Sequence, residues 1–100
     1  MEVEIKQVFI RPNVDTPWIY ETWTTEFRAQ HREYIDTKYN QTGKYTGSFE
    51  LSEDGLILVQ TNLFSSPEAY EEFAADPYLS TMRDVRNDYN IKHNIITSIQ

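Results

Sequence analysis

Residues 44–64 read KYTGSFELSEDGLILVQTNLF, two strand-like runs, 44–52 and 56–64, on either side of Asp54-Gly55. Asp-Gly suits a two-residue type I′ turn, because both central residues of that turn need positive φ. The stretch therefore predicts a β-hairpin with a defined register. Directly opposite residues are then Leu51 and Leu58, Phe49 and Gln60, Gly47 and Asn62, and Tyr45 and Phe64.

This register sorts the side chains of the hairpin onto two faces. One face is strongly aromatic and aliphatic, which predicts the side on which helices pack. On the other face the first strand is polar, but the second strand contributes Ile57, Val59, Thr61 and Leu63. We expect that second face to be covered as well, because so much apolar surface is unfavourable in water.

Ahead of the hairpin, the chain predicts one strand and one helical region. Residues 3–10 are rich in β-branched side chains and alternate at first, as in a strand. A capping side chain followed by proline at 15–17 predicts the start of a helix. Apolar residues then recur at helical spacing, so the helix is predicted over 17–40, either continuous or broken near Arg28.

Behind the hairpin, the chain predicts a second helical region and a last strand. Ser66-Pro67 is a helix start, and Asp76-Pro77 interrupts the helix and restarts it. Residues 91–99 alternate and predict a strand. The order βαββαβ predicts an α+β, ferredoxin-like fold, in which a four-stranded antiparallel sheet carries two helices on one face.

Composition limits the size, partners and location of the protein. A chain of 100 residues has room for one core, and we expect a single domain over residues 1–100. The net charge is −7 and neither half carries a basic patch, so neither nucleic acid nor an anionic membrane is expected as a partner. The absence of cysteine, of an apolar leader and of a run of about 20 apolar residues predicts a cytoplasmic protein.

Helices on one side would leave the other face of the sheet uncovered. Under the predicted registers, that face carries Val8, Ile10, Ile57, Val59, Leu63 and Ile96. Two such sheets packed face to face would bury these side chains, which predicts a homodimer through the open sheet face. The alternative is a monomer with a moderately apolar sheet surface.

The second helical region also carries a family resemblance. Its run SPEAY at 66–70, then Phe73, then DPYL at 76–79, follows a βαββ unit. In this it resembles the dimeric α/β barrel proteins related to the antibiotic biosynthesis monooxygenases. The resemblance implies two sheets that close face to face into a barrel, and a pocket in each subunit between the sheet and the helices. The motif mainly records how a helix is capped and kinked, so it indicates fold far better than activity.

Some members of that family are cofactor-free monooxygenases that oxidise aromatic polyketides with Trp, Tyr and Asn side chains in the pocket. The same residue types here predict a pocket in which polar groups are ringed by aromatic ones. On the predicted sheet, the candidate residues are Gln7, Phe49, Gln60, Asn62 and His93. On the first predicted helix, they are Tyr20, Trp23, His31 and Tyr34.

His93 and Trp23 are the candidate catalytic residues. On its predicted strand, His93 is either a general base with a pKa lowered by burial or a core histidine with both nitrogens hydrogen-bonded. His31 either borders the pocket or lies on the helix surface. The polar groups as a whole are either a binding site or structural groups satisfied by backbone and water.

Other chemistries have little support in the sequence. Haem-degrading members of the same fold use an Asn, Trp and His set with the histidine on the second helix, where this chain has none. Two distant histidines make no metal motif and the glycines build no phosphate loop, so no metal or cofactor is expected. The leading hypothesis is a small-molecule-binding homodimer, acting as a cofactor-independent monooxygenase on an aromatic substrate. The alternative is a non-catalytic binding or assembly module of the same fold, and the sequence leaves open whether the protein is an enzyme.

Overall fold

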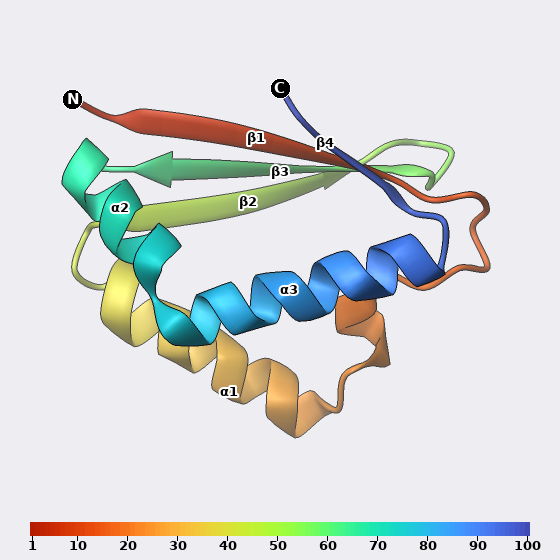
Figure 1. Ribbon diagram of the computed structural model, residues 1–100, viewed down its shortest axis with the longest axis horizontal. Helices are drawn as coiled ribbons and strands as arrows, with labels where there is room; N and C mark the ends of the chain where they lie inside the picture. The colour runs from red at the N-terminus through yellow and green to blue at the C-terminus, as the bar shows by residue number, and fades with distance from the viewer.

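The chain forms a four-stranded antiparallel sheet with its helices on one side (Figure 1). The computed structural model describes residues 1–100. The strands are β1 (Val3–Ile10), β2 (Tyr45–Leu51), β3 (Ile57–Phe64) and β4 (Ile96–Ile99). The helices are the 3-10 helix η1 (Ile19–Thr22), α1 (Thr25–Ile35), the π-helical turn η2 (Asp36–Asn40), α2 (Pro67–Ala75) and α3 (Pro77–Lys92). The strand order β2-β3-β1-β4 confirms the predicted ferredoxin-like α+β fold.

The hairpin of β2 and β3 has the predicted register and a different turn. Only Gly55 has positive φ, +75°, and its N–H donates to the Ser52 carbonyl at 3.0 Å, so the predicted type I′ turn is wrong. The Asp54 carboxylate accepts from the Ser52 hydroxyl at 2.6 Å and from the Leu56 N–H at 3.0 Å, which holds the turn without a positive φ at Asp54. The register is unchanged because Ser52 still closes the ladder, donating its N–H to the Ile57 carbonyl at 2.9 Å.

The first helical region begins and breaks at other places than predicted. The α-helix α1 starts at Thr25, where the Thr24 hydroxyl accepts from the Phe27 N–H at 3.1 Å. The break therefore lies just ahead of Thr24 and not near Arg28, because threonine is a strong N-cap. The residues before it form the short helix η1, and after α1 the helix continues as the wider π-helical turn η2.

The last strand is shorter than predicted, because α3 continues to Lys92. The helix ends in a Schellman motif. Asn94 takes the left-handed conformation, with φ of +58°, and the Ile95 N–H donates to the Asn90 carbonyl at 2.8 Å. The buried side chain of Ile95 then packs under the sheet, and β4 starts only at Ile96. The alternation of residues 91–95 therefore does not reflect a strand.

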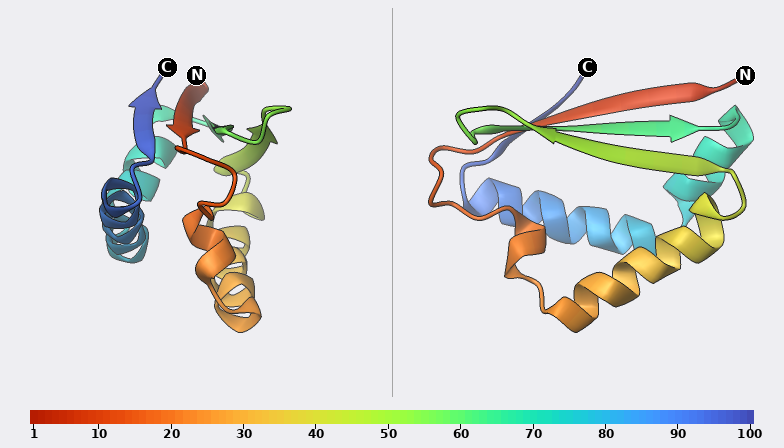
Figure 2. Two further views of the ribbon diagram at one scale, coloured as in Figure 1. Left: turned by 90° about the vertical axis from the view of Figure 1, so that its right-hand side faces the viewer. Right: turned by 180° about the vertical axis from the view of Figure 1, so that it is seen from behind.

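Two hydrophobic clusters hold the helices against the sheet. The first consists of Tyr39, Tyr45, Phe64, Ala69 and Leu79. The second consists of Phe9, Trp18, Leu58 and Ile95. The helix α1 contributes no buried residue to either cluster. Figure 2 shows the reason: α1 is close to the sheet only at its η2 end and slants away from β2 toward its N-terminus.

Asp76 joins the two helical regions, and only 3% of its surface is exposed. Its Oδ1 accepts from the Tyr78 N–H at 2.9 Å and the Leu79 N–H at 3.2 Å, which caps α3. Its Oδ2 accepts from three side chains: the Tyr39 hydroxyl at 2.6 Å, the Tyr34 hydroxyl at 2.7 Å and the Lys38 ammonium at 2.9 Å. Burial alone would raise the pKa of Asp76, but these hydrogen bonds outweigh burial and hold the pKa below its ordinary value.

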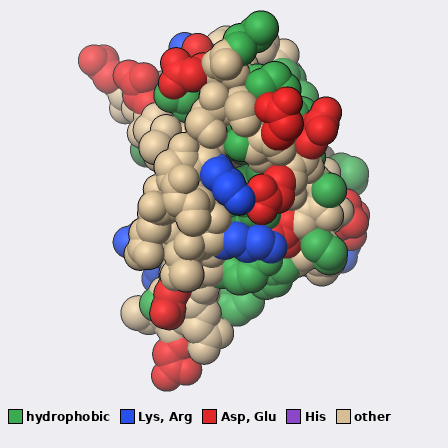
Figure 3. All heavy atoms as spheres, turned by 90° about the vertical axis from the view of Figure 1, so that its left-hand side faces the viewer, with side chains coloured by type: hydrophobic (Ala, Val, Ile, Leu, Met, Phe, Trp, Pro, Cys, Tyr) green, Lys and Arg blue, Asp and Glu red, His purple; other side chains and the backbone are tan.

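A second ion pair lies on the surface near the first. The Lys44 ammonium and a Glu72 carboxylate oxygen are 2.9 Å apart, and both side chains are well exposed. Figure 3, which views the molecule from the side of α2, has basic and acidic side chains next to one another at the centre of this end. Exposed pairs of this kind contribute little to stability, so Asp76 is the more important link.

The sheet face without helices carries the apolar side chains that the registers predict, together with polar residues of β2 and with Glu4, Lys6 and Thr61. We call it the open face; its apolar side chains are Val8, Ile10, Ile57, Val59, Leu63 and Ile96. Ile96 at the edge is 63% exposed and Ile10 is 38% exposed. Whether a second copy covers this face stays a prediction. None of the helices is long and apolar enough to cross a membrane.

Candidate functional site

Three of the predicted site residues meet on the helix-facing side of the sheet. Gln7 on β1 lies directly opposite Gln60 on β3, and Asn62 is the next residue of β3 on the same face. The Tyr45 hydroxyl donates to Asn62 Oδ1 at 2.8 Å, and Asn62 Nδ2 donates to the Ile5 carbonyl at 3.2 Å. The predicted neighbourhood of the three amides is therefore confirmed, and their role in binding stays a prediction.

Asn62 is a structural group in this arrangement, whereas Gln7 and Gln60 are more available. Asn62 is buried and bonded on both its oxygen and its nitrogen. Burial raises the pKa of Tyr45, so its hydroxyl stays protonated and can donate to Asn62 at neutral pH. Gln7 and Gln60 are half-buried; the Gln60 amide also interacts with the Tyr45 hydroxyl, and both amides keep further donors and acceptors that can orient a ligand.

The same side of β2 is poorly covered. Tyr45, Gly47, Phe49 and Leu51 share the helix-facing side of this strand, since side chains alternate along it. Tyr45 is buried, but Phe49 is 61% exposed and Leu51 is 50% exposed. These exposures fit the slant of α1 away from β2 in Figure 2. Apolar side chains on the inner face of the sheet are thus open to a ligand or a partner.

Three of the predicted site residues of the first helical region, Trp23, His31 and Tyr34, belong to a separate aromatic cluster between α1 and α3. The Trp23 ring lies edge-on to Phe27, with ring centroids 4.8 Å apart, and 5.3 Å from the His31 ring. His31 Nδ1 is 2.8 Å from the Tyr78 hydroxyl, and the Tyr34 ring is 4.5 Å from the Tyr78 ring. Burial lowers the pKa of His31, which favours a neutral imidazole that can exchange a proton with a hydroxyl.

An apolar hollow of about 430 Å³ adjoins this cluster. Its lining residues are Trp23, Thr24, Phe27, Met82 and Val85. These residues come from α1, from the segment before it, and from the side of α3 that faces α1. The predicted site residues therefore divide into two groups, one on the sheet and one between the helices.

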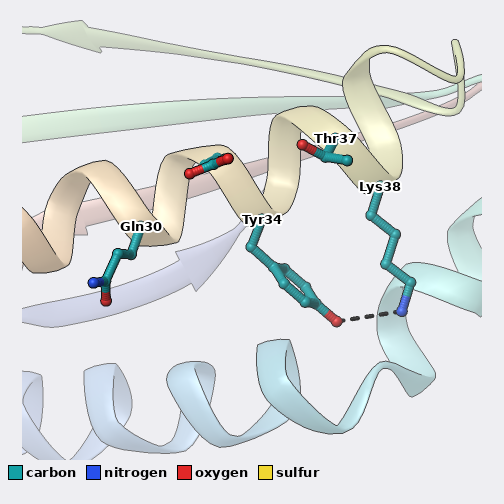
Figure 4. Close-up of a pocket in the computed structure, with 5 residues that line it drawn as sticks. Gln30, Tyr34, Thr37 and Lys38 are labelled. Carbon is teal, nitrogen blue, oxygen red and sulfur yellow. Dashed lines mark hydrogen bonds between the residues drawn. The ribbon is translucent and has the colours of Figure 1, made fainter.

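A second hollow, of about 500 Å³, lies along α1 and is shown in Figure 4. Gln30, Glu33, Tyr34, Thr37 and Lys38 line it. The Lys38 ammonium points to the Tyr34 hydroxyl at 3.2 Å (Figure 4). Both groups also bond to Asp76, so they hold the fold together and are not free to bind a ligand.

The expected position of His93 is wrong. It is the C-cap residue of α3, not a residue of β4, and it lies exposed with its ring stacked on Tyr89 at 4.1 Å. The Schellman motif that ends α3 explains the difference, because it keeps His93 on the helix. A general base at His93 therefore loses its geometric basis. Tyr20, 39% exposed in η1, belongs to neither group of site residues.

Sequence reasoning missed two groups beneath the sheet. Arg86 on α3 is half-buried, and its guanidinium carbon lies 5.2 Å from the centre of the Phe9 ring. Trp18, just ahead of η1, is 4% exposed and packs in the cluster that contains Phe9. The spacing of Arg86 from Met82 and Asn90, four residues each way, places it on the inward stripe of α3 and could have identified it.

The geometry defines the class of protein: an α+β protein with a ferredoxin-like sheet, an open face that carries apolar side chains, and two groups of aromatic and polar side chains. Comparison with known proteins found no matching family model, no similar curated protein and no similar solved structure. No three His, Asp or Glu side chains lie close enough together to hold a metal ion.

Proposed function

We propose that this chain is a homodimeric small-molecule-binding protein, whose ligand lies against the helix-facing side of β2 and β3. One observation carries the proposal: Phe49 and Leu51 are 61% and 50% exposed on the side of the sheet that the helices should cover. Gln60 lies directly opposite Phe49, and Gln7 opposite Gln60. Apolar surface next to a few orienting amides is typical of small-molecule sites, and the aromatic side chains favour a partly aromatic ligand.

Titration with 1-naphthol, followed by amide NMR spectra, tests the ligand site. We expect shifts concentrated at residues 47–51 and 58–62. Phe49→Ala should weaken binding about tenfold, because burying an aromatic side chain contributes at least ~1.5 kcal/mol. Glu50→Ala is the matched control, since Glu50 is the next residue of β2 and faces the other way. Unchanged spectra at millimolar naphthol would contradict the proposal.

The homodimer is proposed to form through the open face. Its support is the group of apolar side chains Val8, Ile10, Ile57, Val59 and Ile96, which share the sheet face that has no helix over it. A second copy presents the same surface, so a two-fold arrangement covers both. Sedimentation at micromolar concentration should give twice the 11.9 kDa chain mass. A species of the chain mass at every concentration would rule the dimer out.

Catalysis is a further part of the proposal: oxidation of a hydroxylated aromatic substrate by molecular oxygen without a cofactor, as the family resemblance implies. Its support is His31, whose pKa is lowered by burial and which lies 2.8 Å from the Tyr78 hydroxyl and next to Trp23. Such an imidazole can take the proton of a phenol. The substrate of this reaction is proposed to lie in the apolar hollow between α1 and α3, apart from the ligand site at Phe49. The proposed location is the cytoplasm, which suits a chain without cysteine.

Oxygen uptake with hydroxylated naphthalenes tests the catalytic part. His31→Gln and Trp23→Phe should each lower the rate at least tenfold, and His93→Gln, an exposed histidine, is the control. Uptake at the background rate in the unmodified protein would reject the enzyme.

The alternative is a non-catalytic binding or assembly module of the same fold. The observation that favours it is the separation of the predicted site residues into a sheet group and a helix group. Ligand binding at Phe49 without oxygen uptake is its expected signature.

A further inference from the structure

Arg86 is a half-buried cation without an anionic partner. Its Nε atom is buried and has no hydrogen-bond partner, while its guanidinium lies over the Phe9 ring. Its one hydrogen bond, from Nη2 to the Asn87 side chain, is long at 3.4 Å. Burial lowers the pKa of Arg86, with the neighbouring Arg83 as a second cause.

The absence of a counter-ion is unexpected in so acidic a protein. The chain has 16 Asp and Glu residues against 9 Lys and Arg residues. Its two ion pairs, Lys38 with Asp76 and Lys44 with Glu72, do not include Arg86. Even partial removal of a charge from water is costly unless the charge is paired and hydrogen-bonded. The chain has more acidic than basic side chains, yet none of the acidic ones forms an ion pair with the Arg86 guanidinium.

A second unpartnered donor lies in the same region. The only other buried side-chain nitrogen without a partner is Trp18 Nε1, and Trp18 packs in the cluster that contains Phe9. Indole and guanidinium nitrogens are donors only. Arg86 Nε and Trp18 Nε1 therefore both lack a hydrogen-bond acceptor, and no acceptor of the chain supplies one.

We infer that Arg86, assisted by Trp18, binds a carboxylate group of the ligand beneath the sheet. The planar guanidinium can donate two parallel hydrogen bonds to a carboxylate. This interaction is stronger in a poorly hydrated site than in water. Phe9 holds the guanidinium in place from one side. The inference rests on the proposed small-molecule function and adds the class of ligand: an aromatic carboxylic acid.

A purely structural Arg86 makes the opposite prediction about stability. If its contact with Phe9 stabilises the fold, replacing Arg86 with methionine lowers the melting temperature. If Arg86 is an unpaired cation kept for a ligand, Arg86→Met fills the same space without the desolvated charge and melts at the same or a higher temperature. Arg32→Met is the matched control, because Arg32 is exposed and has no ion-pair or hydrogen-bond partner.

Calorimetric titration with 2-naphthoate and its uncharged analogue 2-naphthamide tests the inference. We expect the unmodified protein and Arg32→Met to bind naphthoate at least tenfold more tightly than naphthamide. Arg86→Met should lose this preference while still binding naphthamide. Arg86→Lys, which keeps the charge without the planar fork, should retain a smaller preference and guards against a folding defect in the methionine variant.

The outcomes separate the two proposals. Equal binding of naphthoate and naphthamide to the unmodified protein overturns the carboxylate site and leaves the small-molecule function standing. Failure of both compounds to bind overturns both. A lower melting temperature in Arg86→Met, with the naphthoate preference intact, assigns Arg86 a structural role and also overturns the inference.

Discussion

Replacing Asp76 with asparagine tests the network that joins the first helical region to the second. The asparagine side chain has the same shape, and its oxygen can still accept the N–H groups at the start of α3, because asparagine caps helices about as well as aspartate. Its amide nitrogen donates and does not accept. Tyr34, Tyr39 and Lys38 therefore lose their shared acceptor while the cap of α3 is retained.

Tyr39 sets the size of the effect. It has no exposed surface, so its hydroxyl has no access to water, and an unpartnered buried donor costs about 1–3 kcal/mol. Loss of the hydrogen bond from the half-buried Tyr34 lowers the free energy of unfolding by about 1 kcal/mol, the net value of an ordinary hydrogen bond. The exposed Lys38 turns to water instead. The expected loss in the free energy of unfolding is about 3 kcal/mol, and Asp76→Ala should lose about 1 kcal/mol more because it also removes the cap.

Urea unfolding at pH 7 and thermal melting measure this loss. For a chain of this length, about 3 kcal/mol corresponds to a melting temperature lower by roughly 15 °C. Glu72→Gln is the control, since it breaks the exposed pair with Lys44 and should change stability by less than about 0.5 kcal/mol. A loss below about 1 kcal/mol in Asp76→Asn would refute the argument that this network holds the helices together.

The pH dependence of stability provides an independent check. The pKa of Asp76 is depressed in the folded state, while in the unfolded chain it is about 3.9. At pH values between the two, the unfolded state binds more protons, so stability rises with pH there. The contribution of Asp76 is complete above about pH 5 and is lost as the pH falls through the folded-state pKa. Asp76→Asn should flatten this acid limb of the stability curve.

Three further predictions concern the end of α3, the open face and His31. Asn94 has φ of +58°, so Asn94→Ala should lower the free energy of unfolding by about 1 kcal/mol and Asn94→Gly should not, in the same urea assay. Val59→Lys places a charge on the open face and should shift sedimentation toward the monomer. Thr81→Lys changes an exposed residue of α3 and should leave the sedimentation unchanged. Because burial lowers the pKa of His31, the unfolded state binds its proton more readily, and stability should fall as pH drops below about 6.5. His31→Gln should remove that part of the pH dependence and His93→Gln should not. Equal curves of stability against pH for the two variants would contradict this role of His31.

Short-range signals account for the parts of the fold that were predicted correctly. The hairpin register follows from the alternation of β2 and β3 and from a tight turn between them, all within residues 45–64. The start of α2 at Ser66-Pro67 and its interruption at Asp76-Pro77 follow from capping side chains and proline, which act on their own helix turn. These features depend on residues a few positions apart.

The errors occurred where one residue pattern fits two local structures. Residues 91–95 alternate as a strand would, but their backbone completes a helix and its Schellman motif, and the burial of Ile95 favours that outcome. Because residues 91–95 are not a strand, His93 does not lie in the predicted site. The other candidates were the right residue types on the right elements, but their division into two groups depends on how α1 leans away from the sheet.

The sequence by itself determined the order of the elements, the register of the hairpin and which side chains share each face of the sheet, because periodicity and turn chemistry act over a few residues. Only the tertiary structure decided that Asp76 receives three donors from the first helical region, that α1 leaves Phe49 uncovered, and that Arg86 meets Phe9 without an anion. These contacts join residues more than 30 positions apart along the chain, or depend on the angle at which a helix packs, and no local pattern specifies either.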